Sequence, residues 1–400
     1  MSKLRALDEN LNLKDKRIIL RVDLNVPIQQ GKVTDKSRIN KIVPIIKEFT
    51  SKKAKVILIS HLGRPKGKVD QQLSLKPIVP ILETLLNSKI YFSNESRDAE
   101  MIEISKKIKS GEVLLFENIR FNKEEEQNEK SFAIKLSKVG DIFINEAFSC
   151  SHRAHASVCE ITKHINSYAG KLLTEEVNVI KKLISNPKKP VICIIGGSKI
   201  STKIGILNNL IKKIETIVIV GAMANNFIKL EGYNIGKSIF EKNQEKLLKN
   251  IIKQCKINSC NLVLPKDVIV SKDYSSKGSL RDLDKIENTD IILDIGNKTI
   301  EIIKSSILKS KSILWNGPLG VFERKPFDNG TNKIAEIINS NARNFKITAI
   351  AGGGDTIAAI KKAKAEKSFT YISTAGGAFL EWLEGKESPG LKALKENILS

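Results

Sequence analysis

The amino-acid sequence predicts an α/β fold with two doubly wound, parallel-sheet (Rossmann-like) domains joined by an interdomain helix. Three observations lead to this prediction. The 400 residues exceed what one hydrophobic core usually organises. Short β-branched runs recur at a spacing that leaves room for a helix between them, which is typical of parallel strands with crossover helices. An amphipathic segment near the middle separates two halves with similar numbers of such runs.

The expected strands are short, apolar and rich in β-branched residues. In chain order they cover residues 17–22, 55–60, 113–116, 141–144, 191–195, 216–220, 261–264, 312–315, 347–351 and 370–373. Helical patterns lie between them, so we expect helices on both faces of each sheet.

The domain boundaries follow from the central helical segment. It stops before a proline, so we expect the interdomain helix over 171–186. The N-terminal domain then covers 1–170 and the C-terminal domain 187–380. The tail, 381–400, has the pattern of helix, turn and helix, and it could pack on either lobe, including back on the N-terminal domain.

Composition indicates a folded protein of the cytoplasm. Hydrophobic residues make up 41% and charged residues 28% of the chain. No stretch approaches the roughly 20 apolar residues of a membrane span, and the first residues lack the apolar core of a signal peptide. Five cysteines, an odd number spread along the chain, argue for reduced thiols rather than a disulfide framework.

The net charge of +23, from 67 Lys and Arg against 44 Asp and Glu, suits nucleic acid, an anionic membrane or anionic small substrates. Most lysines, however, are scattered over helix-like segments, without an Arg-rich tail or interleaved aromatic residues. We therefore interpret the charge as a solvated basic surface and expect neither a nucleic-acid nor a membrane partner.

Nearly every expected strand ends in a cluster of polar or glycine residues. In open α/β sheets ligands bind outside the carboxyl ends of the strands, so these clusters should lie along one edge of each sheet. The first half places there Asp23, Asn25, His61, Arg64, Arg120, His152 and Arg153, with Arg38 after the next turn. One such arginine is usually a surface residue. Four of them beside strand ends predict a small-anion site, because guanidinium groups match carboxylate and phosphate oxygens.

The second half places glycines and lysines at its strand ends. GGSK covers 196–199 and is followed by Lys203, and GGGDT covers 352–356. Neither run matches the Walker pattern, and each alone could be a tight strand-to-helix turn. Lys199 and Lys203 lie one helical turn apart, and Asp355 is available for magnesium. Together these features favour nucleotide phosphate binding.

A metal site is an alternative interpretation of the segment that contains Cys150, His152, His155 and Cys159. Their residue types suit zinc, but their spacing does not match the usual structural zinc sites. Arg153 between the histidines would also repel a cation. We therefore do not predict zinc here.

Many short blocks of the chain match one family in order, across both halves. They are RVDLNVP, VTDKSRI, SHLGRP, ENIRF, HRAHAS, GGSKISTKI, LDIG, LWNGPLGVFE, GGGDT, STAGGA and EWLEGK. With these blocks the chain resembles the phosphoglycerate kinase family from end to end. The resemblance implies an ATP:3-phosphoglycerate 1-phosphotransferase of glycolysis and gluconeogenesis. Such an enzyme transfers phosphate between 1,3-bisphosphoglycerate and ADP, giving 3-phosphoglycerate and ATP with Mg²⁺. It also implies a monomer with small-molecule partners.

The resemblance further implies a set of residues for each ligand. The phosphoglycerate set is Asp23, Leu24, Asn25, Arg38, His61, Leu62, Gly63, Arg64, Arg120 and Arg153. The nucleotide set is Lys203, Gly296, Asn316, Glu323, Gly353, Gly354, Asp355 and Thr356. Asp355 would also bind the metal, and Arg38 and Lys199 would be the catalytic residues.

Several positions depart from the family's usual residues. They are Leu24 for Phe, Glu146 for Asp, the run Ser149-Cys150-Ser151, Thr202 for Asp, and Ala375 in STAGGA. Of these, Thr202 loses a carboxylate near the lysines. We expect this to affect nucleotide affinity more than activity.

Two other classes fit less well. A nicotinamide dehydrogenase would need G-x-G-x-x-G after its first strand, which here ends in DLNVP. A nucleic-acid-binding protein would explain the charge but would not need GGGDT.

The expected phosphoryl acceptor is a carboxylate, which is already ionised near neutral pH. This agrees with the absence of an obvious general base at the strand ends.

Overall fold

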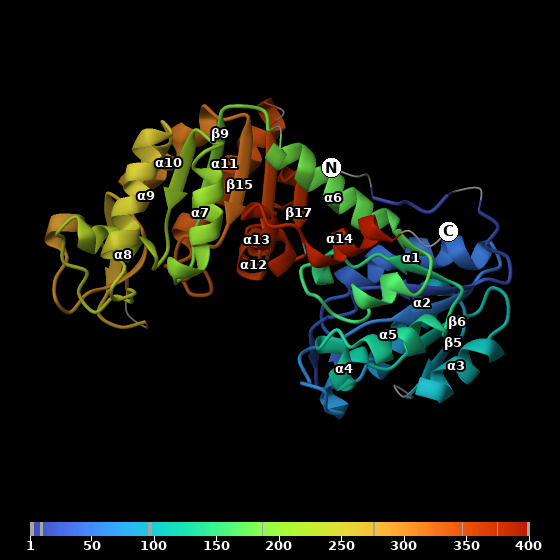
Figure 1. The fold of residues 1–400 in the computed structure, drawn as a ribbon. Helices are drawn as coiled ribbons and strands as arrows, with labels where there is room; N and C mark the ends of the chain where they lie inside the picture. The colour runs from blue at the N-terminus through green and yellow to red at the C-terminus, as the bar shows by residue number, and fades with distance from the viewer. Residues whose placement is uncertain are drawn as a thin grey trace. The chain divides into compact units, whose positions relative to one another are not determined.

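The computed structural model describes residues 4–8, 11–94, 98–185, 187–274, 277–345, 347–373 and 375–397. Residue contacts divide the chain into two compact units. The first consists of Met1–Asn178 and Glu387–Ser400, and the second of Val179–Lys386. Residue 186 of the expected interdomain helix and Thr374 of the STAGGA block lie outside the described residues. Figure 1 shows the course of the chain by colour.

The first unit is built on a parallel sheet with the strand order β5-β6-β4-β1-β7-β8. Its strands are β1 (Arg17–Arg21), β4 (Lys55–Ile59), β5 (Ile90–Ser93), β6 (Val113–Phe116), β7 (Ile142–Asn145) and β8 (Ser167–Ala169). At the carboxyl ends, Arg21 of β1 is level with Ile59 of β4 and Asn145 of β7. The loops that leave these three strands therefore start along one edge of the sheet.

Helices cover both faces of this sheet. They are α1 (Ser37–Ser51), α2 (Val79–Leu86), α3 (Asp98–Lys107), α4 (Lys123–Glu126) and α5 (Lys130–Ser137). Alternate side chains of a strand point to opposite faces. Accordingly, Ile18 and Leu20 of β1 join one hydrophobic core with residues of α1 and α2, whereas Ile19 joins a second core with residues of α3 and α5.

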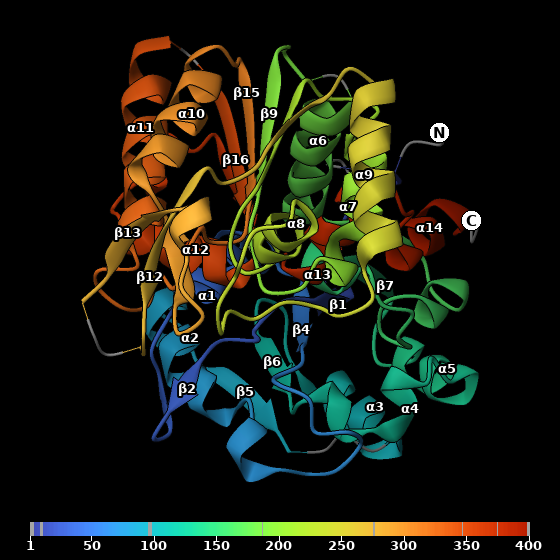
Figure 2. The same ribbon diagram turned by 90° about the vertical axis from the view of Figure 1, so that its left-hand side faces the viewer.

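The second unit has a parallel sheet with the order β11-β10-β9-β15-β16-β17. Its strands are β9 (Val191–Ile195), β10 (Thr216–Ile219), β11 (Asn261–Val263), β15 (Ser312–Asn316), β16 (Thr348–Gly352) and β17 (Tyr371–Ser373). Its helices are α7 (Ile204–Leu210), α8 (Ala224–Leu230), α9 (Glu245–Ile257), α10 (Asn297–Leu308), α11 (Asn329–Phe345), α12 (Gly354–Lys362) and α13 (Gly377–Leu383). In Figure 2, α10 and α11 lie next to β15 and β16.

The second unit also contains an antiparallel sheet with the order β13-β12-β14, and the first unit contains a short hairpin. These strands are β12 (Asp267–Ser271), β13 (Ser279–Asp282), β14 (Ile291–Ile295), β2 (Ile28–Gln29) and β3 (Lys32–Val33). The antiparallel sheet packs its own small core with the end of α8, which includes Ile228, Val268 and Val270.

The helix α6 (Lys171–Ser185) carries the chain from the first unit into the second, and α14 (Pro389–Glu396) belongs to the first unit again. Asn397, directly after α14, donates through Nδ2 to the carbonyls of Thr162 and Ile165. Its Oδ1 accepts from the Ser167 N–H (3.1 Å) and the Arg5 guanidinium (3.2 Å). One side chain near the end of the sequence therefore joins several segments of the first unit.

The predicted fold class is confirmed, because each unit contains a six-stranded parallel sheet with helices between its strands. Each expected strand is present, with ends that differ by no more than one residue. The strands β5 and β8, the hairpin and the antiparallel sheet were not predicted. Among the described residues, no helix is both long and apolar enough to cross a lipid bilayer.

Candidate functional site

The turn after β1 holds Arg38 against two residues at the strand end. Arg38, in the first turn of α1, donates through Nη1 to Asp23 Oδ1 (2.9 Å) and to the Asn25 carbonyl (2.9 Å). The same Asp23 oxygen accepts the Asn25 N–H, and Ser149 Oγ donates to the other oxygen. Asn25 Oδ1 in turn accepts the Gly63 N–H (2.9 Å). The ends of β1, β4 and β7 are thus tied together around one carboxylate.

Arg120 and Asn118 connect the loops after β4 and β6. Arg120 donates through Nη1 to the Gly63 carbonyl (2.8 Å), and Asn118 donates through Nδ2 to the Leu62 carbonyl (2.7 Å). The Arg120 side chain is almost fully buried, and its Nε has no hydrogen-bond partner, with Glu126 Oε1 at 3.5 Å. A buried guanidinium N–H without an acceptor is costly unless a ligand supplies one.

A fully buried arginine, Arg21, lies behind these residues. It donates to the Val22 carbonyl (2.6 Å) and to Ser157 Oγ (3.0 Å). Ser157 is itself held by the buried carboxylate of Glu125, which accepts from both its N–H and its hydroxyl. The network fixes the loop after β7, which carries Arg153.

Burial and Arg21 together determine the protonation and the tautomer of His61. Arg21 Nη2 lies 3.3 Å from His61 Nδ1. Burial, and then the charges of Arg21, Arg120 and Arg38, hold the pKa of His61 well below its usual value. A guanidinium can only donate, so Nδ1 of the neutral ring accepts and the proton is on Nε2. His61 is therefore a hydrogen-bond donor and not a charge.

Two residues of the expected phosphoglycerate set have apolar side chains in the protein core. Leu24 and Leu62 are 0% and 4% exposed and pack with α1 and α2. The Leu24 N–H donates to Ser60 Oγ (2.9 Å). The replacement of the family's Phe by Leu24 therefore changes core packing rather than the polar groups at the strand end.

The other basic residues of this edge are more accessible. Arg64 is exposed and Arg153 is half-buried. Arg153 Nε donates to His152 Nε2 (3.1 Å), and burial, followed by the charge of Arg153, lowers the pKa of His152 to about 4. Cys150 faces Arg21, and Cys159 Sγ lies 3.7 Å from the Arg153 carbonyl. In the part of the chain that the structure describes, no three His, Cys, Asp or Glu side chains form a metal-binding group.

Glu146, where the family usually has Asp, caps the helix α6. Its carboxylate accepts the N–H groups of Lys171 (3.0 Å), Leu172 (2.8 Å) and Leu173 (3.4 Å). Burial raises the pKa of Glu146 to about 7, against the effect of these three donors. A Cβ atom on Gly170 would lie 2.0 Å from the Glu146 carboxyl carbon, so a larger residue at 170 would displace this carboxylate.

In the second unit, glycines allow the loops after β9, β10 and β15 to pack backbone against backbone. A Cβ atom on Gly196 would lie 2.0 Å from the Pro318 carbonyl oxygen, and one on Gly221 would lie 2.8 Å from the Gly197 nitrogen. Gly317 has φ +97° and would meet Gly196. Close packing of these loops is sufficient to explain these glycines. The ligand interpretation must therefore rest on other residues.

Lys203, Asn316 and Thr356 meet where three parallel strands end. Lys203 Nζ donates to Asn316 Oδ1 (2.6 Å), and Asn316 Nδ2 donates to the Gly352 carbonyl (2.6 Å). Thr356 Oγ1 accepts the Gly317 N–H (2.7 Å). Burial is the main cause of the lowered pKa of Lys203. The structure thus brings these three expected nucleotide residues together.

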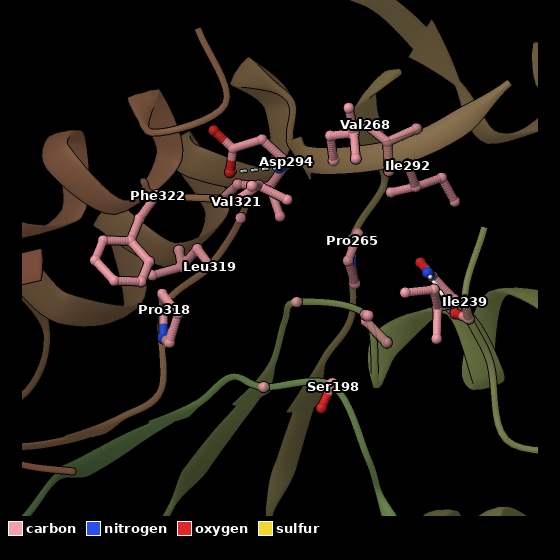
Figure 3. A pocket seen from close by; sticks show the side chains of 18 of the residues that line it. Ser198, Ile239, Pro265, Val268, Ile292, Asp294, Pro318, Leu319, Val321 and Phe322 are labelled. Carbon is pink, nitrogen blue, oxygen red and sulfur yellow. Dashed lines mark hydrogen bonds between the residues drawn. The ribbon is translucent and has the colours of Figure 1, made fainter. Parts of the chain in front are cut away.

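A cavity of about 270 Å³ opens beside the loop after β9. Its walls are mostly apolar, with Ser198, Glu323 and Asp355 among the polar lining residues. In Figure 3, Pro318, Leu319 and Phe322 lie on one side of it and Ile239 on the other. An apolar slot with a few polar groups is the usual form of a site for a flat, mostly apolar ligand group.

Sequence reasoning missed Asp294, which lines this cavity. It is 2% exposed and accepts the N–H groups of Ile295 (2.9 Å) and Gly330 (2.7 Å), and burial raises its pKa to about 7. The LDIG block contained it, but a carboxyl between apolar residues gave no signal of a pocket wall. The expected residue Gly296 directly precedes α10, and a Cβ atom there would meet Asp267, while Ile295 lines the cavity.

The remaining residues that were expected at the nucleotide are accessible to solvent. Lys199 and Asp355 are exposed, and a Cβ atom on Gly354 would meet nothing within 4 Å. Gly353 has φ +101° and precedes α12, so its neighbours begin a helix whose N-terminus is accessible. Thr202, where the family has Asp, donates to the Lys199 carbonyl (2.8 Å) and closes the turn between the two lysines.

Comparisons with known proteins agree with these features. A family model described as phosphoglycerate kinase matches residues 8–386. A phosphoglycerate kinase of Wolbachia pipientis wMel is 45% identical over 98% of this chain and 98% of its own length. One from Agrobacterium fabrum is 42% identical over 98% of this chain and 99% of its own.

The solved structures point to the same family. A phosphoglycerate kinase from Coxiella burnetii superposes with a TM-score of 0.89 at 37% identity, covering 99% of this chain and 100% of that one. The enzyme from Pyrococcus horikoshii OT3 has a TM-score of 0.80 at 29% identity, covering 96% and 97%. This chain belongs to the phosphoglycerate kinase family.

Proposed function

We propose that the protein is an ATP:3-phosphoglycerate 1-phosphotransferase that works reversibly in glycolysis and gluconeogenesis. The observation that carries the proposal is the family match over residues 8–386, which includes both strand-end clusters. In the direction of ATP consumption, a carboxylate oxygen of 3-phosphoglycerate forms a bond to the γ-phosphorus. The bond from that phosphorus to the bridging oxygen of ADP breaks.

We assign one ligand to each unit. The N-terminal domain, 1–170, would bind 3-phosphoglycerate through Arg38, which Asp23 holds in place, and through Arg120 and His61. The domain over 187–380 would bind the nucleotide, with its base in the apolar cavity and its phosphates near Lys203 and the start of α12. The support is the contrast between the buried donors Arg120 and His61 in the first unit and an apolar cavity near the exposed Gly354 in the second.

The residues suit charge stabilisation better than proton transfer. The acceptor carboxylate needs no general base, and the neutral His61 donates from Nε2 rather than abstracting a proton. Arg38 and Lys199 would balance the charge on the transferring phosphoryl oxygens. Transfer also requires the reacting atoms to lie within about 3–3.5 Å and in line.

The residues fit a magnesium ion bound with the nucleotide. Mg²⁺ prefers oxygen ligands and usually keeps several waters, with one or two carboxylates and substrate phosphates. Asp355 offers an exposed carboxylate at the cavity wall, in the first turn of α12. When bound, the ion would neutralise phosphate charge.

A coupled assay of ATP consumption that depends on 3-phosphoglycerate tests the proposed function. Turnover that appears only with both substrates and Mg²⁺ is the expected result. ATP hydrolysis that is independent of 3-phosphoglycerate, or no turnover in either direction, would refute it. We also propose a cytoplasmic monomer, for which sedimentation should give a mass near 44.5 kDa.

A further inference from the structure

The loop that carries the two lysines of the nucleotide site is held at both ends by contacts that trace back to α8. This phosphate loop covers 197–203. At its start, the Gly197 carbonyl accepts the N–H of Met223, the residue just before α8 (3.0 Å). At its far end, the Ser201 N–H (2.9 Å) and Ser201 Oγ (2.5 Å) donate to the two carboxylate oxygens of Glu241.

Glu241 is itself fixed by a side chain of α8. Asn226 donates through Nδ2 to the Glu241 carbonyl (2.7 Å), and Asn226 Oδ1 accepts the Glu241 N–H (3.1 Å). Asn226 is 4% exposed, so this two-way pairing is well protected from water. A carboxylate on such a backbone can hold the loop at a defined distance from the helix.

The segment before Glu241 forms one wall of the nucleotide cavity. Ile239 lines the cavity, and its carbonyl accepts from Asn225 Nδ2 (2.9 Å), again a residue of α8. Figure 3 shows the Ile239 side chain at the side of the cavity. The segment 239–241 therefore lines the cavity expected for the base and also binds the phosphate loop.

The electrostatics of Glu241 agree with an ionised carboxylate that accepts hydrogen bonds from the loop. Burial alone would raise the pKa of Glu241, but the hydrogen bonds from the Ser201 hydroxyl and backbone, and then the charge of Lys199, give a net lowering. The carboxylate therefore stays ionised at neutral pH. In the absence of a structural role, a negative charge here would only repel nucleotide phosphates.

We propose that Glu241 is a positioning residue that holds the phosphate loop, and with it Lys199 and Lys203, in place for the phosphate chain of the nucleotide. The inference rests on the proposed nucleotide site in the second unit. It also bears on the Thr202 departure. Glu241, which is distant in sequence, places a carboxylate near Lys199 and accepts hydrogen bonds from the backbone and hydroxyl of Ser201.

The test compares two ligands that differ only in phosphate. Binding of MgADP to the full-length protein is measured by calorimetry, and binding of adenosine by its competition against MgADP. Glu241→Ala should weaken MgADP binding about tenfold, since hydrogen bonds to a charged group are lost. Adenosine binding should stay within about twofold, because the cavity remains. Glu231→Ala, which removes an exposed acid of the same unit, should leave both affinities unchanged.

Other outcomes are informative about different claims. Equal weakening of MgADP and adenosine would mean a general structural role, and tighter MgADP binding would mean that Glu241 only repels phosphate; either overturns the inference. If the wild type binds neither ligand, the proposed nucleotide site fails and the inference fails with it. If Glu241→Ala does not fold, Ser201→Ala removes one of the two donors. It should then weaken MgADP alone by about threefold, and an unchanged MgADP affinity would refute the proposal.

Discussion

The two strand-end edges are prepared for a negative charge in opposite ways. In the first unit the donors are side chains, several of them buried and fixed by other side chains, as Arg38 is by Asp23. In the second unit the edge is made of closely packed glycine loops beside an apolar cavity, and the lysines stand on one of those loops. On the proposed assignment, preorganised charges of the first unit would hold a small anion. A nucleotide, in contrast, would be held by the shape of the cavity at one end and by a positioned loop at the other.

The largest expected effect concerns Arg38. Arg38→Ala should lower kcat by at least roughly a hundredfold, because one donor to the transferring charge is lost. The matched control is Arg17→Ala at the other end of β1, where Arg17 pairs with Asp141 at the surface. Steady-state kinetics on both variants, with circular dichroism to check folding, would decide the matter. A near-normal kcat for Arg38→Ala would contradict the role of fixed side-chain donors in the first unit.

A second prediction concerns the acid at the start of α12. Asp355→Ala should weaken MgADP binding by about tenfold, because a hard oxygen ligand is removed. Binding of ADP in the presence of a chelator should change little. Calorimetry with and without Mg²⁺ measures both. An equal loss in the two conditions would show that Asp355 acts on the protein or the phosphates and not through the metal.

A third prediction separates backbone strain from ligand contact in the glycine run. Gly353→Ala should destabilise the protein by about 1–3 kcal/mol, because φ is +101° and the new Cβ would meet Asn316 Nδ2 at 2.8 Å. Gly354→Ala has open space and an ordinary φ, so its stability should change by less than about 0.5 kcal/mol. Denaturant unfolding checks both variants. If Gly354→Ala nevertheless weakens MgADP, the phosphate lies against that position.

The smallest expected effect is the pH response of His61. Its pKa is lowered by burial and by three arginines, so its ring should stay neutral as the pH falls through the usual value near 6.5. The ring signals in NMR spectra should therefore not titrate near this pH. Below the unfolded value the unfolded chain takes up a proton that the folded protein does not, so this group lowers the unfolding free energy as the pH falls. A normal titration would mean that burial and the neighbouring arginines do not keep this histidine neutral.

The sequence patterns predicted ten of the parallel strands, because each of these is a short apolar run that ends in unusual residues. They missed β12 and β14, whose apolar runs pair antiparallel outside the main sheet, and the edge strands β5 and β8, whose sequences IYFS and SYA contain at most one β-branched residue. They identified the charged residues of the edges but not their partners. The contact of Arg21 with His61 joins residues 40 positions apart, and that of Lys203 with Asn316 joins residues 113 apart. No local pattern reports such pairings.

The resemblance assigned ligand roles to positions of the chain, and the structure shows what surrounds those positions. Leu24 and Leu62 were expected near phosphoglycerate, and their side chains pack in the core. Gly296 is expected at the nucleotide, and a Cβ atom at this position would meet the Asp267 carboxyl group. Family blocks mark the backbone positions of strand ends, whereas the direction of each side chain depends on the alternation along the strand and on its packing.

The return of the chain to the first unit has a consequence for synthesis on the ribosome. Domains usually fold as units, beginning with the N-terminal one while the rest is still being made. Here Asn397 supplies hydrogen bonds to Thr162, Ile165 and Ser167, and it leaves the ribosome only after the whole second unit. Until then, these backbone groups of the nascent first unit lack their native hydrogen-bond partner. The first unit, which is synthesised first, therefore completes its native hydrogen bonds only after the second unit has been synthesised.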